Sequence, residues 1–189
     1  SVINQKGGVG KTTTVINLAA GLSMKGKKIL VIDLDPQGNA TTGLGLSNST
    51  NSETTIYSVL NGNKKISEVI QETSFDNLNL ITSNVDLSGL EVETAGDSRR
   101  VFKLKDELTS ILNDSGASYD YILIDCPPSL SLLTIMALVA SDALVVPLQT
   151  EFFALEGLTQ LMKTIDRIKS NLNPSLEIRG ILLTMFDKR

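Results

Sequence analysis

A run of ten residues near the start of the chain could bind phosphate. Residues 5–14, QKGGVGKTTT, follow the apolar pair Val2 and Ile3 and precede a stretch with helical periodicity. The glycines let the backbone turn so that several N–H groups point at one spot, and the start of a helix there favours an anion. Lys11 would bring a positive charge to the outer phosphates, and Thr12 would offer a hydroxyl to Mg²⁺. We interpret the run as a phosphate-binding loop rather than a flexible surface turn.

The first residues of this loop depart from the standard pattern G-x-x-x-x-G-K-[ST]. That pattern has glycine where this chain has Gln5, and a second lysine, Lys6, stands directly before the glycine pair. Lys6 could be solvated and idle. Its place on the rim instead suggests that it reaches across an interface to a nucleotide held by a partner. Two phosphate-laden faces repel each other unless lysines bridge them, so such a dimer would depend on ATP.

Three aspartates end two other apolar runs. Asp125 follows four largely apolar residues and has the form of a Walker B acid, which would bind Mg²⁺ through a metal-bound water. Asp33 and Asp35 end the run at 28–35, with side chains on opposite faces if strand geometry persists. Asp35 is the candidate to orient the attacking water. Asp33 is a candidate for the metal, and an indirect role or a strand-end turn is an equally good interpretation.

The composition narrows the possible chemistry. The chain has 189 residues, 41% of them apolar, a net charge of −4 and no histidine. Ser-His-Asp and Cys-His catalysis and zinc sites with histidine ligands are excluded, so any base is a carboxylate or the substrate itself. Cys126 is the only cysteine, which excludes an intrachain disulfide and a Cys₄ cluster and fits a reducing compartment. The charge argues against a broad nucleic-acid surface, although a local basic patch stays possible.

The pattern of apolar residues predicts alternating helices and strands. A helix after the loop presents Val15, Leu18, Ala19 and Leu22 on one face and closes at Gly26. Strands are expected at 28–35, 78–82, 121–125, 143–147 and 178–184. Further helices are expected at 55–60, 66–72, 97–113, from Ser129 onward, and at 156–172. Residues 36–39 should form a loop, and 47–52 an exposed connection.

Such alternation indicates an α/β fold, a doubly wound, mainly parallel sheet with helices on both faces, as in P-loop NTPases. Ligands of these sheets lie beyond the carboxyl ends of the strands, where the loop, Asp33, Asp35 and Asp125 all fall. We expect one P-loop ATPase domain over 1–189, trimmed at both ends. No apolar run has the length of a transmembrane helix, and no signal peptide is expected.

The motifs together resemble the ParA/MinD family of P-loop ATPases over almost the whole chain. KGGVGKTT at 6–13 is similar to the family's deviant Walker A motif, and DCPPS at 125–129 to its Walker B and second switch. DLDPQGN at 33–39 looks like the second motif in its ParA/Soj form, and EFFALEGL at 151–158 is similar to the chromosomal ParA (Soj) pattern. Members of the MinD type typically lack the Pro-Gln-Gly-Asn run.

The resemblance implies an ATPase that forms a sandwich dimer on ATP. The nucleotide-binding residues would be Lys6, Gly7, Gly8, Val9, Gly10, Lys11, Thr12 and Thr13. Mg²⁺ would be held by Thr12, Asp125 and Asp33. Lys11 and Asp35 would take part in hydrolysis, with Lys6 acting in trans, Thr13 near the α-phosphate and Gly7 at the dimer face.

The same resemblance implies a switch in chromosome or plasmid segregation, located in the cytoplasm on the nucleoid. Members bind DNA nonspecifically as ATP dimers, and a ParB-like centromere-binding partner stimulates their weak ATPase. The family's DNA-contacting residues lie largely in the C-terminal part, and Arg189 is a candidate for that surface. Met185-Phe186-Asp187 stands where the family often contacts adenine. No membrane contact is expected.

Three alternatives stay open at this point. A MinD-like membrane-associated positioning ATPase would need a C-terminal amphipathic helix. A redox enzyme of the nitrogenase iron-protein branch would need cluster ligands, for which one cysteine per subunit is too few in the usual dimer-bridging arrangement. A nucleotide-binding module without hydrolysis also fits the motifs.

Overall fold

The computed structural model describes residues 1–47, 52–113, 118–150 and 154–187. Its strands are β1 (Ile29–Asp33), β2 (Gln71–Glu72), β3 (Leu78–Ile81), β4 (Tyr121–Asp125), β5 (Ala143–Gln149) and β6 (Glu177–Thr184). Its α-helices are α1 (Lys11–Ser23), α2 (Asn39–Gly43), α3 (Ile56–Leu60), α4 (Leu90–Glu93), α5 (Lys103–Asn113), α6 (Leu132–Ala140) and α7 (Ala154–Asn171). Short 3₁₀ helices are η1 (Ser52–Thr54), η2 (Ile66–Glu68), η3 (Val85–Gly89) and η4 (Arg100–Phe102).

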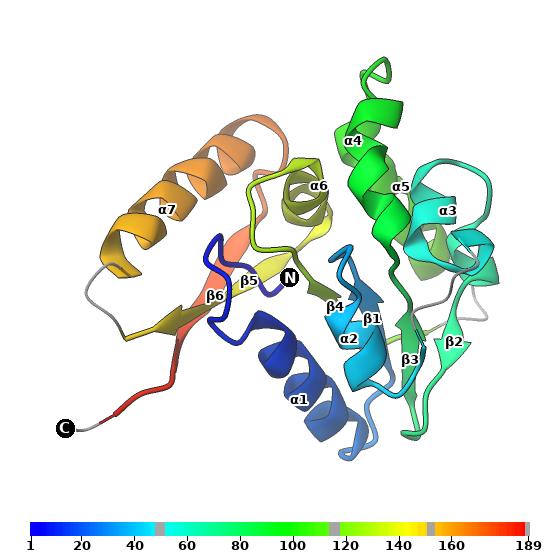
Figure 1. Cartoon of the computed structure of the whole chain (residues 1–189), viewed down its shortest axis with the longest axis horizontal. Coiled ribbons are helices and arrows are strands. Elements are labelled where there is room, and N and C mark those ends of the chain that lie inside the picture. The colour runs from blue at the N-terminus through cyan, green and yellow to red at the C-terminus, as the bar shows by residue number, and fades with distance from the viewer. Residues whose placement is uncertain (48–51, 114–117, 151–153, 188–189) are drawn as a thin grey trace.

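The strands form a mainly parallel sheet in two parts, with the N-terminal segment between them. One part has the order β2-β3-β1-β4, in which only β2 runs antiparallel, and the other pairs β5 with β6. Val2 bridges to Asp125 of β4 and to Val145 of β5, in parallel on both sides. The residues just before the glycine-rich loop therefore lie at the centre of the sheet, as Figure 1 shows.

Alternating side chains of β1 enter two separate apolar cores. Ile29 and Val31 pack with Val15 and Ala19 of α1 on one face of the sheet. Leu30 and Ile32 enter the core on the other face, which is formed largely by α3, α5 and α6. A third core lies between β5, α6 and α7. Helices cover both faces (Figure 1), so the predicted doubly wound α/β fold is confirmed.

The expected helix at 66–72 is wrong beyond its first turn. Ile66 to Glu68 form the single 3₁₀ turn η2, and the chain then pairs with β3 as β2, with Gln71 opposite Leu80. The Gln71 side chain also donates from Nε2 to the Thr54 carbonyl and the Thr82 hydroxyl. Pairing along the sheet satisfies the main chain here, and it outweighs a local preference for helix.

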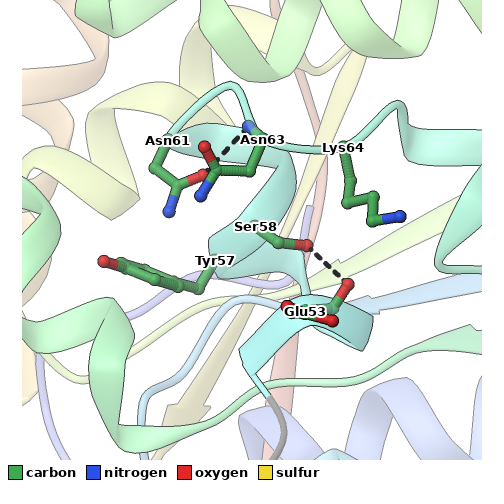
Figure 2. Close-up of a pocket in the computed structure, with 6 residues that line it drawn as sticks. All are labelled: Glu53, Tyr57, Ser58, Asn61, Asn63 and Lys64. Carbon is green, nitrogen blue, oxygen red and sulfur yellow. Dashed lines mark hydrogen bonds between the residues drawn. The ribbon is translucent and has the colours of Figure 1, made fainter.

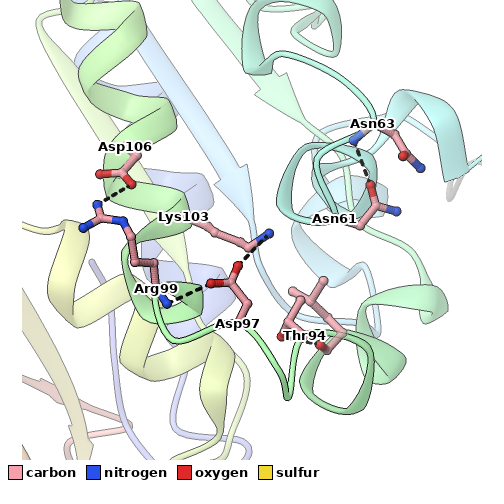
Figure 3. Close-up of polar contacts among 8 residues, drawn as sticks. Asn61, Asn63, Thr94, Asp97, Arg99, Lys103 and Asp106 are labelled. Carbon is pink, nitrogen blue, oxygen red and sulfur yellow. Dashed lines mark hydrogen bonds and ion pairs between the residues drawn. The ribbon is translucent and has the colours of Figure 1, made fainter.

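Three other helix predictions need correction at one end or one face. The expected helix at 97–113 begins only at η4. The Asp97 carboxylate accepts a hydrogen bond from the Arg99 amide (2.8 Å) and pairs with Lys103 (3.3 Å), as Figure 3 shows, and these contacts hold residues 97–99 in a turn. The helix expected from Ser129 begins at Leu132, with Ser131 at the N-cap position. Leu18, expected inside, is 38% exposed, so the buried face of α1 is narrower than its apolar pattern.

One of the two expected connections differs from the prediction. The loop expected at 36–39 passes into a short helix, α2, which begins at Asn39 after Gly38 in the left-handed conformation (φ 65°). Most of the connection expected at 47–52 lies outside the described residues, although Ser47 is exposed as predicted. Within the described ranges, no helix has the length and apolar character needed to cross a membrane.

Candidate nucleotide-binding site

The glycine-rich loop connects the central segment at Val2 to the start of α1. Gly8 and Gly10 have left-handed backbone conformations, with φ of 74° and 87°, which a residue with a side chain rarely adopts. Gly10 is the N-cap of α1, and Thr14 N donates to its carbonyl at 2.9 Å. The free N–H groups of the first turn of α1 therefore face the loop.

Two polar residues outside the predicted set hold the loop in place. Asn4, 4% exposed, donates from Nδ2 to the Pro147 carbonyl (2.7 Å) and accepts from the Lys6 amide (3.0 Å). Thr184, at the end of β6, donates from its hydroxyl to the Val9 carbonyl (2.9 Å). Sequence reasoning missed both because neither belongs to a motif. The one available signal was their place at the end of an apolar run.

Lys11 lies inside the loop rather than in solvent. Its side chain is folded back so that Nζ donates to the Lys6 carbonyl at 3.0 Å, and the residue is 7% exposed. Burial lowers the pKa of Lys11, and the nearby carboxylates of Asp125 and Asp35 oppose that shift. A partly desolvated ammonium at this place could make a charge-assisted contact with a phosphate group.

Thr12 and Asp125 meet at the bottom of the site. The Thr12 hydroxyl donates to Oδ2 of Asp125 at 2.7 Å. Oδ1 of Asp125 is buried and has no hydrogen-bond partner among the described residues. Burial raises the pKa of Asp125 to about 7, and the Thr12 hydrogen bond opposes the rise. A buried carboxylate oxygen without a donor costs free energy that a cation or its bound water would recover, so this pair fits Mg²⁺.

Asp33 lies beside Asp125, but its oxygens are already used. The two residues are directly opposite each other in the parallel register of β1 and β4. Oδ2 of Asp33 accepts from the amide and the hydroxyl of Thr41, both at 2.7 Å, and Oδ1 accepts from the Asp35 amide at 3.2 Å. Burial raises the pKa of Asp33 to about 6. This geometry favours an indirect role over direct contact with the metal.

Asp35 points into the open part of the site. It is 6% exposed, and its Oδ1 accepts from the Gln37 amide at 3.0 Å. A cavity of about 510 Å³ lies in front of it. The cavity is lined by Gly7, Gly8, Gly10, Lys11, Thr12, Thr13, Asp35, Gln37, Asn39, Pro128 and Met185. Residues from four separate stretches of the chain therefore surround one space large enough for a nucleotide.

The predicted site residues fall into those that line this cavity and those that do not. Seven of them line it, whereas Asp33 and Asp125 are fully buried and do not. Val9, 1% exposed, packs into the interior, so only its main chain can serve a ligand. Lys6 is exposed and does not line the cavity of its own chain.

Four lining residues were not among the predicted site residues. Gln37 and Asn39 lie in the segment expected to be a loop, and Pro128 follows β4. Met185 follows β6 with an unusual φ of 51°, and its segment had been singled out without choosing a residue. Local sequence did not show that these positions would face the same space.

A second hollow, of about 390 Å³, lies around α3 (Figure 2). Its lining consists of Glu53, Tyr57, Ser58, Asn61, Asn63 and Lys64. These lining residues include no glycine, so they do not resemble the glycine-rich loop at the first cavity. Among the described residues, no three His, Cys, Asp or Glu side chains could hold a metal ion by themselves.

The raised pKa of Asp125 predicts a pH dependence of stability in the nucleotide-free protein. The folded chain keeps this proton up to about pH 7, whereas the unfolded chain releases it near the ordinary aspartate pKa of 3.8. The folded state then binds more protons between these values, so the free energy of unfolding decreases as pH rises through this window. Between pH 5 and pH 8, the free energy of unfolding of Asp125→Asn should therefore decrease by roughly 1–3 kcal/mol less than that of the wild type.

Urea unfolding of both proteins at the two pH values measures this difference. Asp76→Asn is the matched control, because Asp76 is exposed and the variant changes the same charge. An equal loss of stability with pH in wild type and Asp125→Asn would show that Asp125 is ionised in the folded protein without nucleotide.

Comparison with known proteins identifies the family of the chain. Residues 1–178 match the model of the family AAA_31, described as AAA domain. The chromosome partitioning protein ParA of Caulobacter vibrioides is 51% identical over all 189 residues, which cover 70% of that protein. The sporulation initiation inhibitor protein Soj of Bacillus subtilis is 47% identical, again over the whole chain and 73% of the relative.

A solved structure extends the comparison to bound ligands. The crystal structure of cobyrinic acid a,c-diamide synthase from Mycobacterium smegmatis with bound ADP and magnesium superposes with a TM-score of 0.92 and 38% identity. It covers 100% of this chain and 74% of its own. A protein of this fold therefore binds ADP and magnesium. With a family match over residues 1–178 and relatives identical at about half of all positions, the chain belongs to the AAA_31 family and, within it, to the partition ATPases of the ParA/Soj type.

Proposed function

We propose that this chain is an Mg²⁺-dependent ATPase that dimerises on ATP and acts as a switch in DNA segregation. The observation that carries the proposal is the convergence of Lys11, Thr12 and Asp35 on one cavity, above the buried Asp125 carboxylate. A loop for phosphates, a hydroxyl and carboxylate for the cation, and a second carboxylate for water are the parts that phosphoryl transfer requires.

The loop would hold the phosphates and their cation. Main-chain N–H groups of residues 7–13 and the Lys11 ammonium would surround the phosphate oxygens, with Thr13 toward the α-phosphate. Thr12 and Asp125 would hold Mg²⁺, which when bound neutralises charge on the outer phosphates. Asp33 would act through Thr41 and the main chain of Asp35, as its hydrogen bonds suggest.

Asp35 would orient the attacking water. Its carboxylate lines the cavity, and it accepts one hydrogen bond, from the Gln37 amide to Oδ1. The second oxygen is then available to accept a proton of a water placed before the terminal phosphate. No histidine exists in the chain to take this role.

The loop also supports an ATP-dependent dimer. The main chain of Lys6 is held on both sides, since its amide donates to Asn4 and its carbonyl accepts from Lys11, while the residue itself is exposed. A fixed main chain at an exposed residue suits contact with a nucleotide of the partner. At Gly7, an added Cβ would lie 3.9 Å from the Pro128 Cβ, an ordinary contact. A need for glycine there would therefore come from a facing molecule.

The partners and location follow the family. We infer nonspecific DNA binding in the ATP dimer, stimulation of weak hydrolysis by a ParB-like protein, and a place in the cytoplasm on the nucleoid. The net charge of −4 does not itself favour DNA, so the contact must be local. Arg189, the one residue named for that surface, lies outside the described residues.

Sequence similarity favours this function over two others. The Caulobacter relative named for chromosome partitioning is 51% identical, whereas the Mycobacterium synthase is 38% identical. The alternative of a MinD-like positioning ATPase is disfavoured by the Pro-Gln-Gly-Asn run at 36–39.

DNA binding by the full-length protein carrying Asp35→Ala tests the proposal. This variant should hold ATP without turnover, bind duplex DNA of arbitrary sequence with ATP, and bind it poorly with ADP or no nucleotide. If about four phosphates are contacted, affinity should fall about a hundredfold for a fourfold rise in salt. Fluorescence anisotropy at two salt concentrations measures both effects.

Lys11→Ala is the matched control, because it should lack ATP-dependent DNA binding altogether. ATP-driven dimers that bind no DNA in any state would contradict the segregation function and point to a positioning ATPase acting on another surface.

A further inference from the structure

A closed ring of buried hydrogen bonds stands behind Asp35. Its four members are Asp33, Thr41, Ser83 and Asp35, and they come from the end of β1, from α2 and from the segment after β3. Asp33, Thr41 and Ser83 are fully buried, and Asp35 is 6% exposed. The ring therefore connects Asp35, which lines the cavity, to α2 and to the segment after β3.

Each bond of the ring has a defined donor. Oδ2 of Asp33 accepts from the amide and hydroxyl of Thr41, both at 2.7 Å. The Thr41 hydroxyl in turn accepts from the Ser83 amide at 3.1 Å. Ser83 Oγ donates to the Asp35 carbonyl at 2.6 Å, and the Asp35 amide donates to Oδ1 of Asp33 at 3.2 Å, which closes the ring.

Both main-chain polar groups of Asp35 are thus held by side chains. Its amide is bonded to Asp33 and its carbonyl to Ser83, while its own carboxylate stays in the cavity. The main chain here leaves β1 for the turn before α2, and no strand pairing involves Asp35. The Gly38 amide also donates to the Asp35 carbonyl at 2.9 Å, so two side chains and one turn hydrogen bond fix this residue together.

We infer that Ser83 and Thr41 are positioning residues for hydrolysis, which hold the Asp35 carboxylate at the place where it can orient water. The inference rests on the proposed role of Asp35. The hydroxyl of Thr41 acts as donor and acceptor at once, so it links Asp33 to Ser83 and also fixes the start of α2. Loss of the Thr41 hydroxyl would leave the buried Ser83 amide without this partner, and loss of the Ser83 hydroxyl would leave the Asp35 carbonyl with the Gly38 amide alone. Either change would let the Asp35 main chain shift.

Kinetics of Ser83→Ala test the inference directly. Because a misplacement of about 1 Å can cost about a hundredfold in rate, kcat should fall by about tenfold to a hundredfold. KM and the Kd for ATP should stay within about twofold, because Ser83 does not line the cavity. Single-turnover hydrolysis and nucleotide titration of the full-length protein measure the two quantities separately.

Ser58→Ala is the matched control. Ser58 is also buried, 2% exposed, and its hydroxyl donates to the main-chain carbonyls of Thr55 (2.9 Å) and Glu53 (3.1 Å). Figure 2 shows the contact with Glu53. It lines the hollow at α3 and not the nucleotide cavity. Both variants should lower the melting temperature by similar amounts, whereas only Ser83→Ala should lower kcat.

A pair of variants at Thr41 keeps the inference testable if Ser83→Ala does not fold. Thr41→Ser retains the hydroxyl and should keep kcat near the wild-type value, while Thr41→Val retains the shape without the hydroxyl and should lose about tenfold or more. Equal kcat in these two variants would overturn the inference.

The outcomes also separate this inference from the proposed function. If Asp35→Ala is inactive and Ser83→Ala keeps the wild-type kcat, the positioning role is wrong and the function stands. If Asp35→Ala hydrolyses ATP at the wild-type rate, the proposed role of Asp35 is wrong and the inference falls with it.

Discussion

Replacing Lys11 by alanine is expected to abolish ATP binding. Lys11 lies in the cavity with its ammonium already desolvated and directed along the loop, 3.0 Å from the Lys6 carbonyl. Removal of a buried charge from a charge-assisted contact costs about 2–5 kcal/mol, which corresponds to roughly 30- to 4,000-fold in Kd. Calorimetric titration with a non-hydrolysable ATP analogue measures this loss.

The matched control is Lys25→Ala. Lys25 follows α1 and is exposed, so its removal changes the net charge equally without touching the cavity. Its Kd should equal that of the wild type. Nucleotide binding of wild-type strength by a folded Lys11→Ala protein would show that the loop amides alone hold the phosphates.

Replacing Asp35 by alanine should stop hydrolysis and leave ATP binding and dimerisation intact. The carboxylate faces the cavity but is not among the groups that would hold the phosphates, so its loss should act on the chemical step. Removal of a positioned general base typically costs about a hundredfold to ten-thousandfold in rate. Single-turnover ATP hydrolysis measures kcat, and light scattering of the ATP-bound protein measures the dimer.

Asp76→Ala serves as the control for this variant. Asp76 is exposed on the turn before β3, and its removal makes the same change in charge. Hydrolysis by Asp35→Ala at the wild-type rate would assign the water to another group. A simultaneous loss of ATP binding would instead mean that Asp35 helps to hold the nucleotide or its cation.

The two buried carboxylates suggest why the site would need its ligand. Asp33 and Asp125 stand opposite each other in neighbouring strands, and the charge of Asp33 adds to the burial that raises the pKa of Asp125. Asp33 is compensated by Thr41, but one oxygen of Asp125 is not compensated among the described residues. A bound cation would remove this repulsion, so nucleotide with Mg²⁺ should stabilise the fold as well as occupy the site.

The phosphate loop and the carboxylates at the strand ends could be predicted from sequence because each is a local pattern. A glycine-rich turn before a helix, and an aspartate after an apolar strand, have the same meaning wherever they occur in a fold of this class. The strand at 121–125 was predicted with its observed bounds for the same reason, since a continuous apolar run between turn residues is read locally.

Errors arose where neighbours in space decided the local structure. Residues 71–72 became a strand because β3 lies beside them, and Leu18 faces outward although it continues an apolar stripe. The start of α5 depends on the side-chain contacts of Asp97, which compete with the helix in a way that periodicity does not reveal.

Sequence by itself determined which chemistry this protein can perform, because residue type and spacing set the phosphate loop, the hydroxyl and the carboxylates. Tertiary structure alone decided which of those groups faces the cavity and which is enclosed by other residues. Asp33 and Asp35 are two residues apart, and the sequence leaves open whether Asp33 contacts the metal, yet Asp33 is enclosed by Thr41 and Asp35 faces the cavity. Asn4, Ser83 and Thr184 acquire their roles only because the parallel sheet brings their strand ends to the same edge, where each finds a main-chain group to hold.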